Sequence, residues 1–129
     1  MKYFYTWQEF DKDIEKIAAW AKLQNFKSVY GIPRGGLVVA VALSHHLDLP
    51  LEIETQDISQ DTLVVDDISD SGNTLCVLGE KLAFKPIVAA IFYNKSTRRM
   101  PDYALREKTE WVVFPWETDV SSKYDYTFG

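Results

Sequence analysis

The segment from Leu63 to Thr74 combines the residue types that bind a phosphorylated sugar. Its sequence, LVVDDISDSGNT, predicts an apolar strand that stops at two adjacent carboxylates, Asp66 and Asp67, and then a turn into a helix. Paired carboxylates accept hydrogen bonds from a vicinal diol such as ribose O2 and O3. The amide groups at the start of a helix attract a phosphate, and Ser71 can add a hydroxyl donor. The spacing therefore predicts a site for a ribose 5-phosphate.

Taken alone, the pair Asp66 and Asp67 is also compatible with two different structures. The two residues could be the solvated polar end of a strand. They could also be the acidic pair of a receiver domain, where the pair follows the first strand and another Asp follows two strands later. The DSGNT run at 70–74 favours a ligand site over both. Neither the G-x-x-x-x-G-K-[ST] phosphate loop nor the G-x-G-x-x-G motif occurs in the chain.

The composition is that of one globular domain spanning residues 1–129. Apolar residues make up 47% and charged residues 26%. A net charge of −5 argues against a sequence-independent grip on nucleic acid, but it is compatible with a small anion held by local donors and a metal ion. Residues 3–8 contain no signal-peptide core, and no 18-residue apolar stretch predicts a membrane span. The single cysteine, Cys76, cannot form an internal disulfide, so we expect a cytoplasmic protein.

Apolar runs and helical periodicities alternate along the chain. Helices are predicted at about 7–23, 36–46 and 72–82, and the first begins with a capping box from Thr6 to Glu9. Strands are predicted at 28–32, 51–55, 62–65, 86–93 and 110–114. This alternation predicts a single α/β domain with a parallel sheet flanked by helices, and ligands at the carboxyl ends of the strands.

Three segments resemble the motifs of one enzyme family. Val64 to Thr74 resembles the phosphoribosyl-pyrophosphate signature of type I phosphoribosyltransferases: hydrophobic residues, two acidic residues, two apolar or small residues, then Asp-[Ser/Thr]-Gly-x-Thr. Gly31 to Val38, GIPRGGLV, is similar to the family's pyrophosphate loop, above all in the bacterial and archaeal xanthine, guanine and hypoxanthine enzymes. Trp111 to Glu117, WVVFPWE, resembles the small C-terminal segment that covers the base in those enzymes. The three segments follow one another in the family's order.

For the signature segment, the resemblance implies a role for each polar residue. Asp66 and Asp67 would hold the ribose hydroxyl groups, directly or through water bound to Mg²⁺. Asp70 would be the catalytic residue, because it would accept the proton of purine N7 as N9 attacks the sugar. The 5-phosphate would be wrapped by five consecutive residues, Asp70, Ser71, Gly72, Asn73 and Thr74.

The pyrophosphate loop implies a site for the leaving group. Arg34, together with the amides of Gly35 and Gly36, would hold pyrophosphate, and a cis peptide bond would precede Arg34. Glu117 would help Asp66 and Asp67 to hold the magnesium ion.

The base-covering segment implies the purine site. Trp111 would stack on the ring, and Val112 would meet the base through its backbone. Lys95 would donate a hydrogen bond to the purine O6, although Asn94 competes for that position.

The activity implied is transfer of phosphoribosyl from phosphoribosyl pyrophosphate to hypoxanthine, xanthine or guanine. The products would be a nucleoside monophosphate and pyrophosphate, and we expect a homo-oligomer, a dimer. The family normally inserts a long mobile hairpin between the pyrophosphate loop and the signature, but only 27 residues separate Gly36 from Val64 here. Three alternatives stay open: a slow reaction, a lid supplied by a partner subunit, or a lidless binding or regulatory module.

Overall fold

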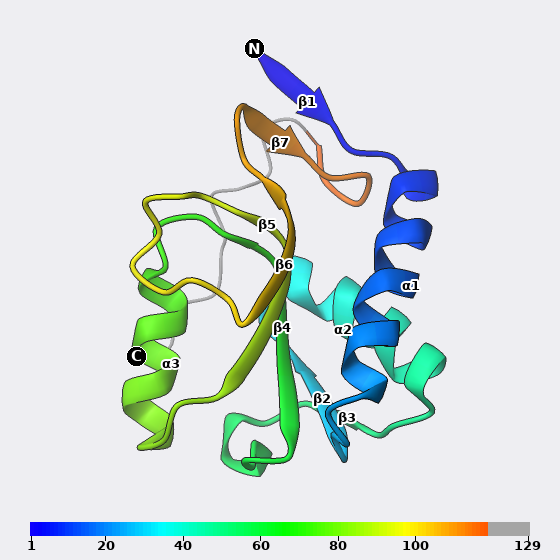
Figure 1. Cartoon of the computed structure of the whole chain (residues 1–129). Coiled ribbons are helices and arrows are strands. Elements are labelled where there is room, and N and C mark those ends of the chain that lie inside the picture. The colour runs from blue at the N-terminus through cyan, green and yellow to red at the C-terminus, as the bar shows by residue number, and fades with distance from the viewer. Residues whose placement is uncertain (119–129) are drawn as a thin grey trace.

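A five-stranded sheet forms the centre of the molecule. The computed structural model describes residues 1–118, and all neighbouring strands of this sheet run parallel, in the order β3-β2-β4-β5-β6 (Figure 1). Their bounds are β2 Ser28–Gly31, β3 Leu51–Glu52, β4 Thr62–Ser69, β5 Ile87–Tyr93 and β6 Tyr103–Glu107. The predicted class, a parallel sheet flanked by helices, is confirmed.

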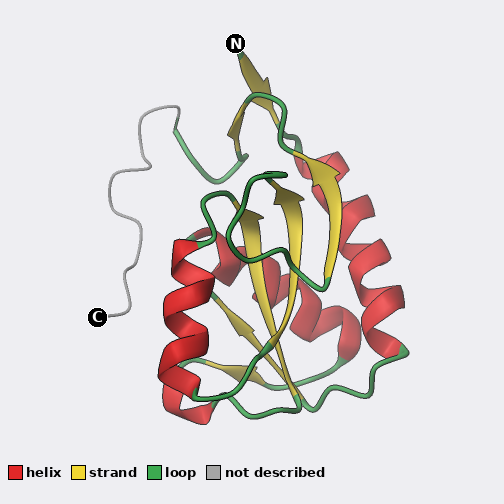
Figure 2. Cartoon of the chain, turned by 60° about the vertical axis from the view of Figure 1, so that its left-hand side comes forward, coloured by secondary structure: helices red, strands yellow, loops and turns green. Residues whose placement is uncertain are grey.

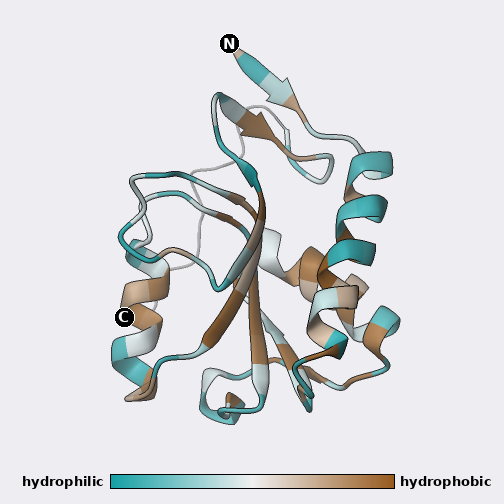
Figure 3. Cartoon of the chain, viewed as in Figure 1, coloured by the Kyte–Doolittle hydropathy of each residue, from teal (hydrophilic) through white to brown (hydrophobic). Residues whose placement is uncertain are grey.

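Helices cover both faces of the sheet (Figure 2). Helices α1 (Trp7–Lys22) and α2 (Gly35–Leu47) pack on one face, and α3 (Asn73–Leu82) packs on the other. Successive residues of β4 therefore face different helices: Leu63 lies in the core beside α1 and α2, and Val64 lies beside α3. Both faces are buried, which explains the unbroken apolar run in this strand. Figure 3 shows hydrophobic residues along the central strands and hydrophilic residues along the outer face of α1.

The helix boundaries follow from local chemistry. The capping box is confirmed, since the Glu9 amide donates to Thr6 Oγ1 and the Thr6 amide donates to Glu9 Oε1. Helix α2 ends at Asp48, which adopts a left-handed conformation. Helix α3 begins after Gly72, whose φ of +84° favours glycine.

Three sequence predictions about strands need correction. Strand β4 does not stop at Asp66 and Asp67 but continues through both to Ser69, because its pairing with β5 continues to Tyr93. Strand β3 is only two residues long; residues 53–54 belong to no helix or strand, and a 3-10 turn at Thr55–Asp57 (η1) begins at the last residue of the predicted strand. Strand β6 was not predicted at all, because Tyr103–Glu107 is half-buried and carries no apolar run.

A second, two-stranded sheet lies beyond the carboxyl ends of the central strands (Figure 1). It pairs β1 (Lys2–Phe4) with β7 (Trp111–Val113) in parallel register, with Tyr3 opposite Val112. The predicted strand at 110–114 therefore exists but does not join the central sheet. We call residues 1–5 and 111–117 the hood; this small covering segment is built from both ends of the described chain.

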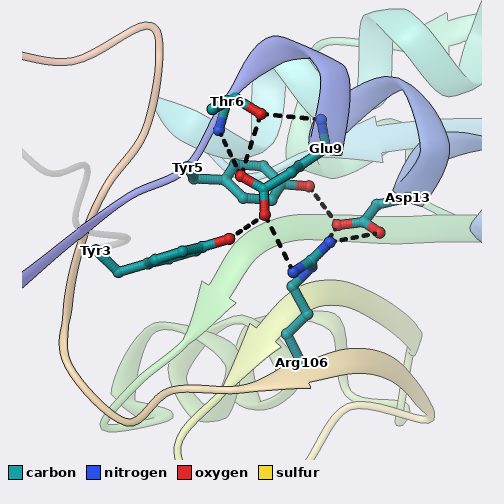
Figure 4. Close-up of polar contacts among 6 residues, drawn as sticks. All are labelled: Tyr3, Tyr5, Thr6, Glu9, Asp13 and Arg106. Carbon is teal, nitrogen blue, oxygen red and sulfur yellow. Dashed lines mark hydrogen bonds and ion pairs between the residues drawn. The ribbon is translucent and has the colours of Figure 1, made fainter.

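A buried polar network joins the hood to β6 and α1 (Figure 4). Asp13 on α1 is only 1% exposed, and its carboxylate accepts hydrogen bonds from Arg106 Nε at 2.7 Å and from the Tyr5 hydroxyl. Arg106 also donates to Glu9, which accepts a hydrogen bond from the Tyr3 hydroxyl. The hydrogen bond to Asp13 raises the pKa of Arg106, and burial together with Asp13 raises the pKa of Tyr5. The charge of Asp13 is thereby compensated inside the core.

Within residues 1–118, no helix has the length and apolar character needed to cross a bilayer.

Asp13→Asn should destabilise the fold by about 1–2 kcal/mol, because it weakens the hydrogen bonds that Asp13 accepts from Arg106 and Tyr5 in the core, while Arg106 keeps Glu9. Asp11→Asn, on the exposed side of the same helix, should change the free energy of unfolding by less than about 0.5 kcal/mol. Urea denaturation of both variants measures the difference. Equal unfolding midpoints would show that the network contributes nothing to stability.

Candidate functional site

The carboxyl ends of β2, β4 and β5 and the hood border an open cavity of about 1040 Å³. Such a position is where open parallel sheets bind ligands. Twelve of the residues expected at the site line it: Arg34, Gly35, Asp66, Asp67, Asp70, Ser71, Gly72, Asn73, Thr74, Trp111, Val112 and Glu117. Two others, Gly36 and Lys95, do not.

The loop between β4 and α3 has the geometry of a phosphate cradle. The N-terminus of α3 carries no side-chain cap, and the Asn73 amide donates to Ser71 Oγ. A Cβ on Gly72 would lie 2.6 Å from the Arg99 amide nitrogen, so only glycine fits at this point. The Arg98 amide donates to the Ser71 carbonyl, and Arg98 Nη1 donates to Asn73 Oδ1 at 2.7 Å. The loop after β5 therefore braces the cradle and adds a guanidinium group to it.

Close packing between α2 and β4 holds the acidic pair. A Cβ on Gly35 would overlap Asp67 Oδ2, so the glycine allows this carboxylate to reach the start of the helix. Asp67 is only 8% exposed, while Asp66 Oδ1 accepts a hydrogen bond from the Asp67 amide at 2.8 Å. The two carboxylates and the N-terminal turn of α2 thus form one rigid wall of the cavity.

The expected pyrophosphate loop is present in outline. The Pro33–Arg34 peptide is cis, as predicted, and both residues line the cavity. Gly36 lies outside the lining, where its Cα packs against the carbonyl of Val65, since an added Cβ would be 2.7 Å from that oxygen. Gly36 therefore serves the contact between α2 and β4, and its side of the loop does not border the ligand space.

Asp70 is held by two hydrogen-bond donors from elements that follow it in the chain. Asn94 Nδ2 donates to Oδ1 at 3.0 Å, and Lys108 Nζ donates to Oδ2 at 2.7 Å. Burial by itself raises the pKa of Asp70, but the hydrogen bonds from Lys108 and Asn94 outweigh it, so that pKa lies below its usual value. Asp70 is consequently an ionised carboxylate at neutral pH.

Lys95 does not occupy the place expected for it. Its side chain is 77% exposed and lies 3.8 Å from Glu107, and Asn94 turns inward in its stead. The physical reason is the turn after β5: the Ser96 amide and hydroxyl both donate to Asn94 Oδ1, which fixes Asn94 toward Asp70 and leaves the next side chain outside.

Lys108, Asn94 and Arg98 also border the cavity, although the sequence motifs gave them no role or only an alternative one. Lys108 carried no usable signal, because it follows β6, a strand that no pattern predicted. Asn94 was a competing candidate beside Lys95. Arg98 stands in a loop of polar residues, and nothing local distinguishes it from a solvated cation.

Aromatic residues line the hood side of the cavity. Trp111 is 46% exposed and borders the cavity, as a platform for a flat ring requires, and Val112 lies beside it. Phe114 and Trp116 stack on each other with ring centroids 4.9 Å apart, and the indole nitrogen of Trp116 is buried without a hydrogen-bond partner. The stack packs against Phe10 of α1 and so fixes the hood to that helix.

The acidic residues fit a magnesium ion only together with a phosphorylated ligand. Among the described residues, no three His, Cys, Asp or Glu side chains gather closely enough to hold a metal by themselves. Asp66 and Asp67 fit the usual pattern for Mg²⁺, one or two carboxylates completed by water and substrate phosphate. Glu117 Oε1 accepts a hydrogen bond from the Phe114 amide, so this carboxylate is engaged in closing the turn of the hood.

Residues 53–61 do not form a lid. None of them lines the cavity, and η1 lies at the opposite end of the sheet from the hood (Figure 1). Ile58 is buried against Leu75 and Leu78 under α3. The described chain therefore leads from β3 into β4 without passing over the cavity.

Fold and cavity define a class of protein, the α/β proteins with a cavity at the carboxyl edge of a parallel sheet and a small hood beside it. No family model matches the chain. A purine phosphoribosyltransferase from Pyrococcus horikoshii has a similar structure, with a TM-score of 0.78, 32% identity and coverage of 91% of this chain and 94% of that one. The Helicobacter pylori xanthine-guanine-hypoxanthine phosphoribosyltransferase gives a TM-score of 0.79 at 25% identity, covering 92% and 96% of the two chains.

Curated sequences give the same result. Xanthine-guanine phosphoribosyltransferase of Desulfotalea psychrophila is 29% identical over 142 residues, with 91% of this chain and 87% of the relative covered. The enzyme of that name from Nitratidesulfovibrio vulgaris is 27% identical over 140 residues, with 89% and 84% covered. The chain belongs to the type I phosphoribosyltransferase family. Both alignments are longer than this chain of 129 residues, so these relatives carry residues that the chain lacks.

Lys108→Met should raise the pKa of Asp70 toward the usual carboxyl value of about 4, because it removes the donor that most favours the ionised form. The folded-state pKa of Asp70 is depressed, so the pair stabilises the fold at neutral pH, and this contribution is lost as the pH falls through that pKa. A carboxyl-carbon NMR titration measures the change. Lys95→Met is the matched control and should leave the Asp70 titration unmoved.

Proposed function

We propose that this protein is a purine phosphoribosyltransferase. It transfers the phosphoribosyl group of phosphoribosyl pyrophosphate to hypoxanthine, xanthine or guanine and releases pyrophosphate. The observation that carries the proposal is the cavity that joins the signature loop, the Arg34 loop and Trp111. The names of the relatives support the substrate class.

Each part of the cavity has a place in this reaction. The cradle at 71–74, together with the backbone of Asp70 and the side chain of Arg98, binds the 5-phosphate, and Asp66 and Asp67 bind the ribose hydroxyl groups. Arg34 and the Gly35 amide hold pyrophosphate. Because the anomeric carbon is attacked as pyrophosphate leaves, the site needs charge stabilisation and no nucleophilic side chain.

The base lies between Trp111 and the cradle, with N9 toward the ribose. N9 attacks the anomeric carbon, the bond from that carbon to the pyrophosphate oxygen breaks, and the N7 proton moves to Asp70. Val112 meets the base through its backbone. Asp66 and Asp67, together with the substrate, would hold Mg²⁺, which would supply charge neutralisation on pyrophosphate.

The decisive experiment is incubation of the whole chain with phosphoribosyl pyrophosphate, Mg²⁺ and one purine at a time, with pyrophosphate release as the readout. Release should require a purine and should stop when the metal is chelated. Release with no purine at all would indicate hydrolysis of the donor in place of transfer.

Asp70→Asn should slow turnover at least tenfold, which corresponds to about 1.4 kcal/mol of barrier, while phosphoribosyl pyrophosphate binding stays close to that of the wild type. The substitution removes the proton acceptor and keeps the shape of the side chain. Asp57→Asn, on the exposed η1 turn, is the control and should leave the rate unchanged. An Asp70→Asn rate equal to the wild type would remove Asp70 from the proton transfer.

A second candidate function is a lidless binding or regulatory module that holds phosphoribosyl pyrophosphate or a nucleotide without turnover. The position of residues 53–61 favours it, because lid closure normally excludes water and completes such a site. Ligand binding without pyrophosphate release from any purine would select this function. If a partner subunit supplies the missing cover, the turnover rate per chain should instead rise with protein concentration.

Both functions require the phosphate cradle, so ligand stabilisation tests it separately. A ligand at one hundred times its Kd adds about 2.7 kcal/mol to folding stability, so phosphoribosyl pyrophosphate with Mg²⁺ should raise the Tm clearly. Gly72→Ala should abolish this rise, because its Cβ would enter the backbone of 98–99. Gly79→Ala is the matched control, since its Cβ would meet only Pro86 at 4.0 Å. An equal rise in both variants would place the phosphate elsewhere.

The proposal includes a cytoplasmic location and a homodimer. The free thiol of Cys76 supports a reducing compartment. Sedimentation at several protein concentrations measures the oligomeric state.

A further inference from the structure

The connection between β5 and β6 is short for a pair of neighbouring parallel strands. Such strands are normally joined by a crossover of about a dozen residues or more, usually with a helix in it. Here residues 94–102 make the whole crossover, and none of them belongs to a helix. We call residues 94–102 the crossover loop; it passes beside the start of α3 (Figure 1). Without helical hydrogen bonds, its backbone needs other contacts to hold its shape.

One part of the crossover loop is fixed to the phosphate cradle. The guanidinium group of Arg98 donates to Asn73 Oδ1 at 2.7 Å, and Ser69 Oγ, at the end of β4, donates to the Arg99 carbonyl at 2.9 Å. A Cβ on Gly72 would lie 2.6 Å from the Arg99 amide nitrogen, so the loop and the cradle are in direct backbone contact. The place of the Arg98 guanidinium therefore depends on the course of the loop backbone.

Another part of the loop is fixed to the amino end of β5 by a single side chain, that of Arg99. Its Nη2 donates to the Pro86 carbonyl at 2.8 Å and lies 3.3 Å from Asp102 Oδ2. Its Nη1 donates to the Met100 carbonyl. Asp102 Oδ2 also accepts a hydrogen bond from the Val88 amide at 2.8 Å, and the Asp102 amide donates to the Val88 carbonyl. One guanidinium group thus joins the loop to itself and to β5.

These contacts determine direction more than they determine stability. The Asp102 side chain is 37% exposed, and ion pairs with exposed carboxylates contribute little to folding. A guanidinium group, however, presents its donors in a rigid planar fork, so several acceptors together fix its orientation. The Arg99 side chain is only 14% exposed and does not border the cavity, whereas Arg98, the preceding residue, does.

We propose that Arg99, held by Asp102, is a positioning residue for the 5-phosphate: it fixes the crossover loop so that Arg98 directs its guanidinium group into the cradle. This inference rests on the proposed function, because it assumes that the 5-phosphate occupies the cradle at 71–74. Without the anchor, the Arg98 side chain would have to be ordered when the phosphate binds, which costs free energy. With the anchor, its donors are in place before the phosphate arrives.

Equilibrium binding of ribose 5-phosphate to the full chain tests this inference without requiring turnover. Arg98→Met should weaken binding about tenfold or more, because it removes a charge-assisted hydrogen bond. Arg99→Met should weaken binding about three- to tenfold, the cost of ordering one long side chain, although Arg99 does not border the cavity. Arg99→Lys should lose less affinity than Arg99→Met. Lys81→Met removes an exposed cation from the last turn of α3 and should bind as the wild type does.

The double variant distinguishes positioning from a general disturbance of the structure. If Arg99 acts through Arg98, the chain with both Arg98→Met and Arg99→Met should bind no more weakly than Arg98→Met alone. A substitution that merely loosened the fold would lower the affinity by the same factor in both backgrounds. Melting curves establish that each variant is folded. If Arg99→Met does not fold, Arg99→Lys takes its place in the comparison.

The outcomes separate this inference from the proposed function. Wild-type affinity in folded Arg99→Met, or losses that multiply in the double variant, overturns the positioning role and leaves the proposed function standing. Wild-type affinity in Arg98→Met overturns it as well, because the guanidinium group would then have no part in the phosphate site. A wild type that does not bind ribose 5-phosphate removes the cradle and with it both proposals. If the effect of Arg99 depends on Arg98 but no purine releases pyrophosphate, the inference holds and the transfer reaction fails.

Discussion

The carboxylate of Asp13 is buried between α1 and the central sheet. Because a buried charge must be paired or hydrogen-bonded, Asp13 constrains the elements at the cavity end of the molecule. Arg106 reaches it from β6 and Tyr5 from the segment after β1, so one buried charge ties three elements together (Figure 4). An ion pair of this kind contributes little net stability but strongly disfavours arrangements that break it. It therefore fixes where β6 ends and where the hood sits, and thereby the position of Lys108.

A second constraint is the contact between backbone and carboxylate on the opposite wall. Gly35 and Gly36 let the first turn of α2 approach β4 more closely than any side chain would allow. Asp67 is thus held against the helix N-terminus, where amide dipoles stabilise negative charge. Acidic groups that are already held in place need little reorganisation free energy when a sugar diol or a metal binds. This is the benefit of a preorganised polar site.

Among residues 1–118, the hood residues 111–117, the loop after β5 and Lys108 border the cavity beyond the central strands. The segment between β3 and β4, from which the family's lid normally arises, instead packs Ile58 into the core under α3. Electrostatic interactions are weaker in a site that stays open to water than in a closed one. The cradle and the acidic pair, which the proposed function uses for binding, do not depend on such a lid for their contacts.

Local sequence was sufficient for the parts of the site that form within one segment. A strand, an acidic pair and a DSGNT turn specify their own geometry, so the cradle, the capping box and α1–α3 were predicted close to their observed places. The parts of the fold and site that depend on contacts between residues distant in sequence could not be predicted from local sequence. Strand β6 carries no period, the pairing of β1 with β7 joins residues more than one hundred positions apart, and Asn94 faces Asp70 because a local turn excludes Lys95. Only the tertiary structure brought Lys108 to Asp70, because the buried charge of Asp13, far away in sequence, holds the strand that carries it.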